Sequence, residues 1–121
     1  MSSSLHKSQA DLSSFGERLR SQRKRLKLSQ EALGVSIGLD ESCSRIRISR
    51  YETGVHEPSI NTSKRLAITL EVPVAYLYCE KNSIANIILL LHALTDTQLI
   101  DATEYIRSLL QKNNVNNVKF D

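Results

Sequence analysis

The segment Arg45–Gly54 concentrates the side chains with the most specific binding chemistry, and it reads Arg-Ile-Arg-Ile-Ser-Arg-Tyr-Glu-Thr-Gly. The segment is compatible with a helix, and Ile48 and Tyr51 are three residues apart, so both can point into a core. Ser49 and Arg50 then lie on or beside the outer face. Arginine can bond guanine O6 and N7 together, and serine can bond either type of base. These residues alone favour a DNA-reading helix and a solvated basic helix equally.

Residues that could support catalysis are scattered along the chain. His6, His56 and His92 fall in an arm, a loop and a helix end, without a carboxylate partner at a useful spacing. The sequence has no glycine-rich phosphate loop and no nucleophile motif. Cys43 lies near a helix N-terminus and close to Arg45, so it can be a redox sensor or an ordinary small side chain. We expect no enzymatic activity, no cofactor and no metal site.

The composition limits the chain to one domain with at most an appendage, because 121 residues provide one modest core. Apolar residues make up 40%, which rules out a wholly disordered chain. Aromatic residues make up only 5%, which argues against a carbohydrate site or a stacking platform for single strands. The net charge of +3 arises in residues 15–58, with nine Lys and Arg against six Asp and Glu. A basic segment of this kind is the electrostatic footprint of nucleic-acid binding.

Targeting signals and cysteine pairs are missing from the sequence. No signal-peptide core follows Met1, and the longest apolar run, Ile87–Leu91, is far too short to span a membrane. Cys43 and Cys79 are too few for a secreted disulfide scaffold, and they lack the paired spacing of a zinc site. We therefore expect a cytoplasmic protein without a membrane partner.

Capping signals divide the first half of the chain into helices. Ser14–Glu17 is a capping box, and the helix after it carries a charge run that can be a solvated face or a phosphate-binding face. A second helix starts at Ser29. Gln30 then lies in its first turn, where backbone N–H groups and the positive end of the helix can meet a phosphate. Gly34 inside this helix costs up to about 1 kcal/mol relative to alanine, which the close approach of a neighbouring helix would explain.

The third predicted helix spans about residues 41–52, with Asp40 as its N-cap and Gly54 as its stop. Its inward row is Ser44, Ile48 and Tyr51. Two helices joined by a tight glycine-containing turn, the second with a basic outer face, form a helix-turn-helix. A fourth helix follows Pro58-Ser59, and Pro73 marks the first turn of a short fifth, which completes a five-helix domain over residues 14–79.

Six ordered stretches carry a family resemblance. They are Phe-Gly-Glu-Arg-Leu-Arg-Ser-Gln-Arg from Phe15, Leu-Ser-Gln-Glu-Ala-Leu from Leu28, Gly-Leu-Asp from Gly38, Ile-Ser-Arg-Tyr-Glu-Thr-Gly from Ile48, Pro58-Ser59, and Leu-Glu-Val-Pro-Val-Ala-Tyr-Leu from Leu70. Together they resemble the Cro/CI-type (XRE-like) helix-turn-helix regulators over about residues 13–79. The resemblance implies an all-α, five-helix, lambda-repressor-like DNA-binding domain that is usually a dimer on a two-fold-related operator.

The resemblance also implies roles for individual residues. Those at positions that face base edges are Arg45, Ile46, Ser49 and Arg50. Gln30 matches a phosphate-contacting residue, and Thr53 matches one near the DNA backbone. Arg23 and Glu52 match a pair that forms a salt bridge behind the recognition helix. From the basic side chains of these helices we add Arg18, Lys27 and Arg47 as phosphate contacts.

The sequence departs from the family pattern between Asp40 and Ile48, where the chain is about four residues longer. Four residues are about one helical turn, so they can lengthen the third helix without rotating its faces, or they can loop out. A longer helix would let Ser42 read an extra base edge or let Glu41 accept from cytosine N4. Ser63 replaces an apolar residue of the family, and we expect it to weaken that face of the fourth helix.

Residues 80–121 lie outside the resemblance and predict a C-terminal helical hairpin with a second capping box, Thr95–Gln98. The apolar residues predicted for the dimer interface are Ile84, Ile87, Ile88, Leu91, Ile106, Leu109 and Leu110. The hairpin has more apolar surface than one packing face needs. Homodimerisation is the favoured interpretation, because half-sites on DNA repeat at one helical turn and a paired reader gains avidity. The alternatives are packing back onto the domain, a different protein partner and a small-ligand pocket. Residues 1–13 predict a flexible arm, and residues 113–121 a frayed tail.

These observations predict a sequence-specific regulator of transcription that binds double-stranded DNA, with a dimeric repressor as the favoured form. The competing interpretation is a protein-interaction module, such as an antitoxin, whose hairpin is the principal functional surface. RNA binding ranks third, because a helix cannot enter the deep, narrow major groove of A-form RNA.

Overall fold

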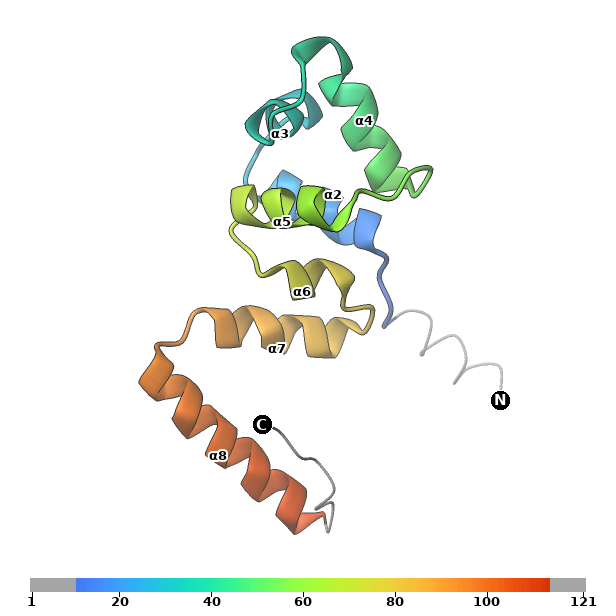
Figure 1. The fold of residues 1–121 in the computed structure, drawn as a ribbon. Helices are drawn as coiled ribbons and strands as arrows, with labels where there is room; N and C mark the ends of the chain where they lie inside the picture. Colours follow the sequence, from blue (N-terminus) through green and yellow to red (C-terminus); the bar gives the residue numbers. More distant parts are fainter. Residues whose placement is uncertain (1–10, 114–121) are drawn as a thin grey trace, which may run out of the picture.

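The computed structural model describes residues 11–113; residues 1–10 of the predicted arm and residues 114–121 of the predicted tail lie outside this range. Within the range the chain forms seven helices (Figure 1). They are α2 (Phe15–Arg25), α3 (Gln30–Ser36), α4 (Glu41–Thr53), α5 (Ile60–Thr69), α6 (Val74–Tyr78), α7 (Asn82–His92) and α8 (Asp96–Lys112). The predicted all-α class is confirmed.

Several helices begin and end at the residues whose side chains predicted these boundaries. The Glu17 N–H donates to Ser14 Oγ at 3.2 Å, and the Ser14 N–H donates to Glu17 Oε1 at 3.1 Å, so the capping box of α2 is complete. Thr95 and Gln98 form the same reciprocal pair at the start of α8. Gly54 ends α4 with a φ of 78°, a left-handed conformation that glycine adopts readily.

The hydrophobic core lies between α2, α3, α4, α5 and α6. Its fully enclosed large side chains are Leu19, Leu33, Ile48, Leu66, Leu70 and Leu77. Ser63 of α5 is also completely buried, and its hydroxyl shares a hydrogen bond of 2.7 Å with the Tyr78 hydroxyl. Because the Ser63 hydroxyl has this partner, Ser63 does not leave an unpaired polar group in the core.

α3 and α4 approach closely because Gly34 has no side chain. A Cβ atom at Gly34 would overlap the Ser44 hydroxyl and would lie 2.9 Å from Ser44 Cβ. In that space Ser44 Oγ donates to the carbonyl oxygen of Glu31 at 2.7 Å. The helix contact predicted for Gly34 is confirmed. Gly16 has the same role between α2 and α4, where a Cβ atom would lie 2.7 Å from the Tyr51 carbonyl oxygen.

Residues 11–13 do not belong to a loose arm, and this part of the prediction for residues 1–13 is wrong. The Ser13 N–H donates to the Glu80 carbonyl oxygen at 2.9 Å, and the Asn82 N–H donates to the Asp11 carbonyl oxygen at 2.8 Å. These bonds fasten the segment before α2 to the connection between α6 and α7. Such distant backbone pairing leaves no local sequence pattern.

The two C-terminal helices form where they were predicted, but they pack differently. α7 packs on α6, with Ala85 completely buried. α8 buries none of its residues and extends away from the helical body formed by α2–α7 (Figure 1). Among residues 11–113, none of the helices combines the length and the hydropathy that crossing a lipid bilayer requires.

Candidate nucleic-acid interface

The third helix of the predicted domain is α4, an uninterrupted helix of 13 residues that begins after Asp40. The four extra residues therefore lengthen the helix and do not loop out. Since they add about one turn, the faces of the helix keep their direction. The bond from Ser44 to α3 holds the added turn against the rest of the domain.

The inner and outer faces of α4 are separated as the sequence predicts. The inward row is Ser44, Ile48 and Tyr51, with exposed fractions of 0%, 0% and 8%. On the outside Arg45, Ile46 and Arg50 are exposed, and Ser49 is half-buried. Because the inner row is held in the core, the outer row has a fixed orientation relative to the other helices.

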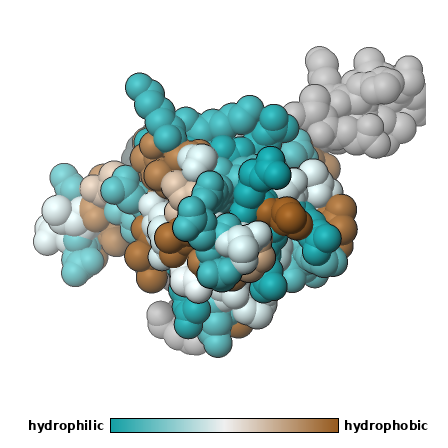
Figure 2. Space-filling view, turned by 90° about the horizontal axis from the view of Figure 1, so that it is seen from above, coloured by the Kyte–Doolittle hydropathy of each residue, from teal (hydrophilic) through white to brown (hydrophobic). Residues whose placement is uncertain are grey.

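The base-reading candidates lie beside the predicted phosphate-contacting residue. One shallow hollow, here named the reading hollow, is lined by Gln30, Arg45, Ile46, Ser49 and Arg50. Gln30 is the first residue of α3, so unpaired N–H groups of that helix end lie next to the hollow. Hydrophilic side chains predominate on the end of the molecule that carries α3 and α4 (Figure 2). The arrangement can hydrogen-bond an extended polyanion and the base edges beside it.

A buried ion pair supports the reading hollow from behind. Arg23 Nε and Nη2 donate to the Glu52 carboxylate at 2.6 and 3.1 Å, as predicted for this pair. Arg23 Nη1 donates to the carbonyl oxygen of Leu28 at 2.9 Å. Gln30 Nε2 donates to Glu52 Oε1 at 3.1 Å, so the same carboxylate also positions the phosphate-contact candidate.

Two predicted hydroxyl contacts already have partners within the chain. Ser42 Oγ donates to the Asp40 carboxylate, and Thr53 Oγ1 donates to the Ser49 carbonyl oxygen at 3.0 Å. Each hydroxyl oxygen keeps its capacity to accept from a base or a backbone group. Both residues are exposed, so the structure leaves them accessible from outside.

The basic candidates fall in three different places. Lys27 is exposed just after α2 and has a left-handed backbone, with a φ of 58°. Arg47 is exposed on the flank of α4 away from Gln30, in a second hollow that also includes Arg50. Arg20 was not predicted as a contact, but it lines a hollow that includes Gln30 and Arg45. Its position three residues before Arg23 places both on one face of α2, which is the signal that could have identified it.

Arg18 does not face a nucleic acid, and its prediction as a phosphate contact is wrong. The residue is only 5% exposed, and its guanidinium lies 5.1 Å from the centre of the Tyr76 ring. It donates to the carbonyl oxygens of Cys79 and Glu80 at 2.7 and 3.1 Å, and to Asn82 Oδ1 at 2.8 Å. Arg18 thus binds α2 to the connection between α6 and α7.

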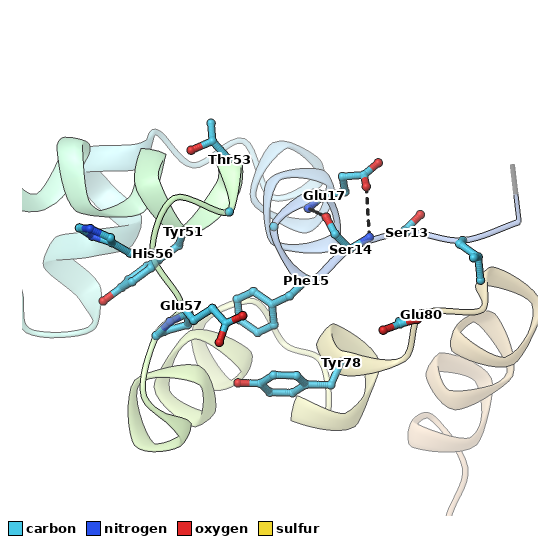
Figure 3. A pocket seen from close by; sticks show the side chains of 14 residues that line it. Ser13, Ser14, Phe15, Glu17, Tyr51, Thr53, His56, Glu57, Tyr78 and Glu80 are labelled. Atoms are coloured by element: carbon cyan, nitrogen blue, oxygen red, sulfur yellow. Dashed lines mark hydrogen bonds between the residues drawn. The ribbon is translucent and has the colours of Figure 1, made fainter. Parts of the chain in front are cut away.

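The hollow in Figure 3 has a different electrostatic character. Phe15 and Tyr78 lie next to each other in its lining, with ring centroids 4.9 Å apart. Glu17, Glu57 and Glu80 contribute carboxylates to the lining. Carboxylates repel phosphate groups, so we do not assign this hollow to the nucleic-acid interface.

The apolar residues predicted for dimerisation are divided between α7 and α8. The most exposed are Ile84 and Ile87 at 49% each, Ile106 at 43% and Leu109 at 42%. Ile88, Leu91 and Leu110 are half-buried, and Ile88 packs against the core. α8 also exposes Ile100 and Tyr105. α8 therefore presents apolar side chains that the rest of residues 11–113 leaves exposed.

The fold and the reading hollow define a helix-turn-helix protein. Residues 19–77 match the helix-turn-helix family model. Transcriptional regulator BswR is 39% identical, with a TM-score of 0.75 over 80% of this chain and 96% of that one. The P22 c2 repressor, in its crystal structure with synthetic operator 9T, is 35% identical, with a TM-score of 0.50 over 55% of this chain and 94% of that one. A comparison with curated proteins gives no match. The chain belongs to the Cro/CI-type (XRE-like) helix-turn-helix family of transcriptional regulators.

Proposed function

We propose that this chain is a sequence-specific, dimeric repressor that binds double-stranded DNA and reads the major groove with α4. The observation that carries the proposal is the reading hollow, in which Gln30 lies beside Arg45, Ile46, Ser49 and Arg50. Phosphate contacts set the register of a protein on DNA and base contacts supply specificity, so a surface that offers both suits a groove. The likeness to the P22 c2 repressor, which was crystallised with an operator, supports the proposal.

In this proposal the outer face of α4 reads the bases. Arg45 and Arg50 donate to guanine, Ser49 bonds a base edge, and Ile46 contacts a thymine methyl group. Ser42 extends the reading from the added turn. The phosphate contacts are Gln30, Lys27, Arg47, Thr53 and Arg20. The protein then works in the cytoplasm beside its DNA and has no catalytic role.

The dimer in this proposal forms through α8 and the exposed face of α7. Two copies related by a two-fold axis can place their α4 helices on half-sites about 34 Å apart, one turn of the duplex. Linking two readers raises the overall affinity without any new base contact. The second candidate is an antitoxin-like module with a different protein on the same surface, which the same exposed apolar residues of α8 favour.

Selection of bound duplexes from a random DNA pool at two salt concentrations tests the DNA-binding part. A two-fold-symmetric motif with half-sites one turn apart supports the proposal, and its half-site length shows whether the added turn reads bases. Motif-free binding that disappears at the higher salt contradicts it. Arg50→Ala should weaken binding to the selected motif by about tenfold or more and spare unrelated duplexes. Equal weakening of both would remove Arg50 from the base readers.

Sedimentation of the full chain tests the dimer. The wild type should sediment as a dimer, and Ile106→Asp should sediment as a folded monomer because it places a charge in the interface. Thr97→Asp is the matched control, because this exposed position lies on the opposite side of α8. A monomeric wild type contradicts the dimer and leaves the surface to the second candidate.

A further inference from the structure

We propose that Tyr51, together with Arg47 and His56, forms a second phosphate-binding subsite on the flank of α4 away from Gln30. Its occupant is a backbone phosphate of the bound duplex. The inference rests on the proposed function and deepens it, because it assigns a ligand-binding role to a residue of the inward row.

The hydroxyl of Tyr51 is the first observation. The residue is 8% exposed, and its side chain belongs to the hydrophobic core. Within the described part of the chain, its hydroxyl makes no hydrogen bond to another protein atom, and every enclosed side-chain polar atom has a partner. The hydroxyl therefore reaches solvent. The phenol of Tyr76, by contrast, accepts from Gln22 Nε2 at 3.0 Å. A buried phenol with a free hydroxyl can bind a group from outside the protein.

The surroundings of this hydroxyl favour an anion. Tyr51 lines a shallow hollow whose polar lining also includes Ser42, Arg47, Arg50, His56 and Glu57. The guanidinium groups of Arg47 and Arg50 outweigh the Glu57 carboxylate in this hollow, and the imidazole adds a further donor. Tyr51, His56 and Glu57 also line the acidic hollow of Figure 3, so we assign the subsite to the side of these residues that faces Arg47. In Figure 3 the ring of Tyr51 points to the side of α4 on which His56 lies. The backbone N–H of His56 donates to the Arg50 carbonyl oxygen at 3.2 Å, which fixes this loop residue next to the helix.

The position of the hollow favours a DNA phosphate over a free one. Ile46 and Arg50 line both this hollow and the reading hollow, so the two hollows adjoin across the outer face of α4. A major groove is bordered by one sugar–phosphate backbone on each side. Gln30 serves one flank of α4, and Tyr51 with Arg47 and His56 serves the other. A helix that lies in the groove would thus be held from both backbones.

Tyr51→Phe tests the subsite, because it removes the hydroxyl and keeps the ring that packs in the core. Binding to the selected duplex and to an unrelated duplex should both weaken by roughly five- to tenfold, since one charge-assisted hydrogen bond is lost to a sequence-independent group. The slope of log affinity against log salt should stay unchanged for Tyr51→Phe. For Arg47→Gln the slope should fall by about 1. Tyr76→Phe is the matched control, because the hydroxyl that it removes bonds Gln22 inside the protein, and it should leave both duplex affinities unchanged.

Duplexes with a single neutral methylphosphonate identify the phosphate. At one position in each half-site, the methylphosphonate should weaken duplex binding by the wild type. The same methylphosphonate should cause almost no further loss of affinity in Tyr51→Phe. Additive losses at every position, or an unchanged affinity in Tyr51→Phe, would overturn the subsite. Binding of inorganic phosphate that depends on Tyr51, without an effect on duplex affinity, would also overturn it in favour of a free anion. If the wild type selects no duplex, the proposed function itself fails, before any variant is compared.

Discussion

Arg23 of α2 and Glu52 of α4 form an ion pair that is almost closed to solvent, with 11% and 3% of their side chains exposed and 2.6 Å between Nε and Oε2. Gln30 of α3 donates to the same carboxylate. Three helices therefore meet at Glu52, directly behind the face of α4 that we propose reads DNA. The carboxylate fixes the reading helix relative to both of its neighbours.

Glu52→Ala should lower the free energy of unfolding by about 3 kcal/mol or more, because it leaves the Arg23 charge enclosed without a counter-ion. The double variant Arg23→Met/Glu52→Leu should be less destabilised than Glu52→Ala alone, since neither charge remains. Urea unfolding of the three proteins measures the difference. A loss below about 1 kcal/mol in the single variant would contradict the buried pair.

Gly34→Ala should destabilise the protein by about 1–3 kcal/mol, because the added Cβ atom forces α3 away from Ser44. This loss exceeds the gain in helix propensity, which is at most about 1 kcal/mol. Thermal unfolding followed by circular dichroism measures it. Ser44→Gly in the same chain should restore part of the loss, because it frees the space that the new methyl group needs. Failure of this rescue would place the strain elsewhere.

Arg18 and Arg20 should respond in opposite ways, although they are two residues apart on one helix. Arg18→Met should lower the free energy of unfolding by about 2 kcal/mol, because several buried acceptors lose their donor. The salt dependence of DNA binding by Arg18→Met should equal that of the wild type. Arg20→Gln should leave stability nearly unchanged and reduce the salt slope by about 1. Equal salt slopes in both variants would remove Arg20 from the phosphate contacts.

Glu71→Gly should raise the free energy of unfolding by about 0.5–1 kcal/mol. Glu71 follows α5 with a φ of 61°, a left-handed conformation that is unfavourable for a residue with a Cβ atom. Glycine removes that strain, although it gives the unfolded chain more freedom. Gly54→Ala provides the reverse test, because Gly54 has a φ of 78°, and it should be destabilising. A melting temperature that falls in Glu71→Gly would contradict the strain.

Local patterns in the sequence predicted the helix boundaries and the inner face of α4. Ser14 and Glu17 are three positions apart, and Ser44, Ile48 and Tyr51 recur at helical spacing, so a short window contains both partners of each contact. The sequence alone did not decide whether the four extra residues lengthen α4 or loop out, because the outcome depends on how Ser44 packs against α3. That contact needs Gly34 and the Glu31 carbonyl together.

Local sequence patterns could not predict contacts between segments that are distant along the chain. The acceptors of Arg18 lie more than sixty positions along the chain, so its charge was interpreted as part of a solvated or phosphate-binding run. One local signal was available, because Arg18 lies three residues after Phe15 and next to Leu19 on the inner face of α2. The free hydroxyl of Tyr51 also required coordinates, since its spacing indicates only that the ring is buried.

The exposed surface of α8 has a consequence for how the regulator responds to its own abundance. Among residues 11–113, the 17-residue helix α8 has no fully buried residue, so it gains little stability from packing on the other described helices. In the proposed dimer, its folding and its association therefore become one equilibrium, which depends on protein concentration. While most chains are single, occupancy of a two-fold site rises with the square of the concentration. A twofold change in synthesis then changes occupancy by about fourfold, which gives a steeper dose response than a monomeric reader could produce.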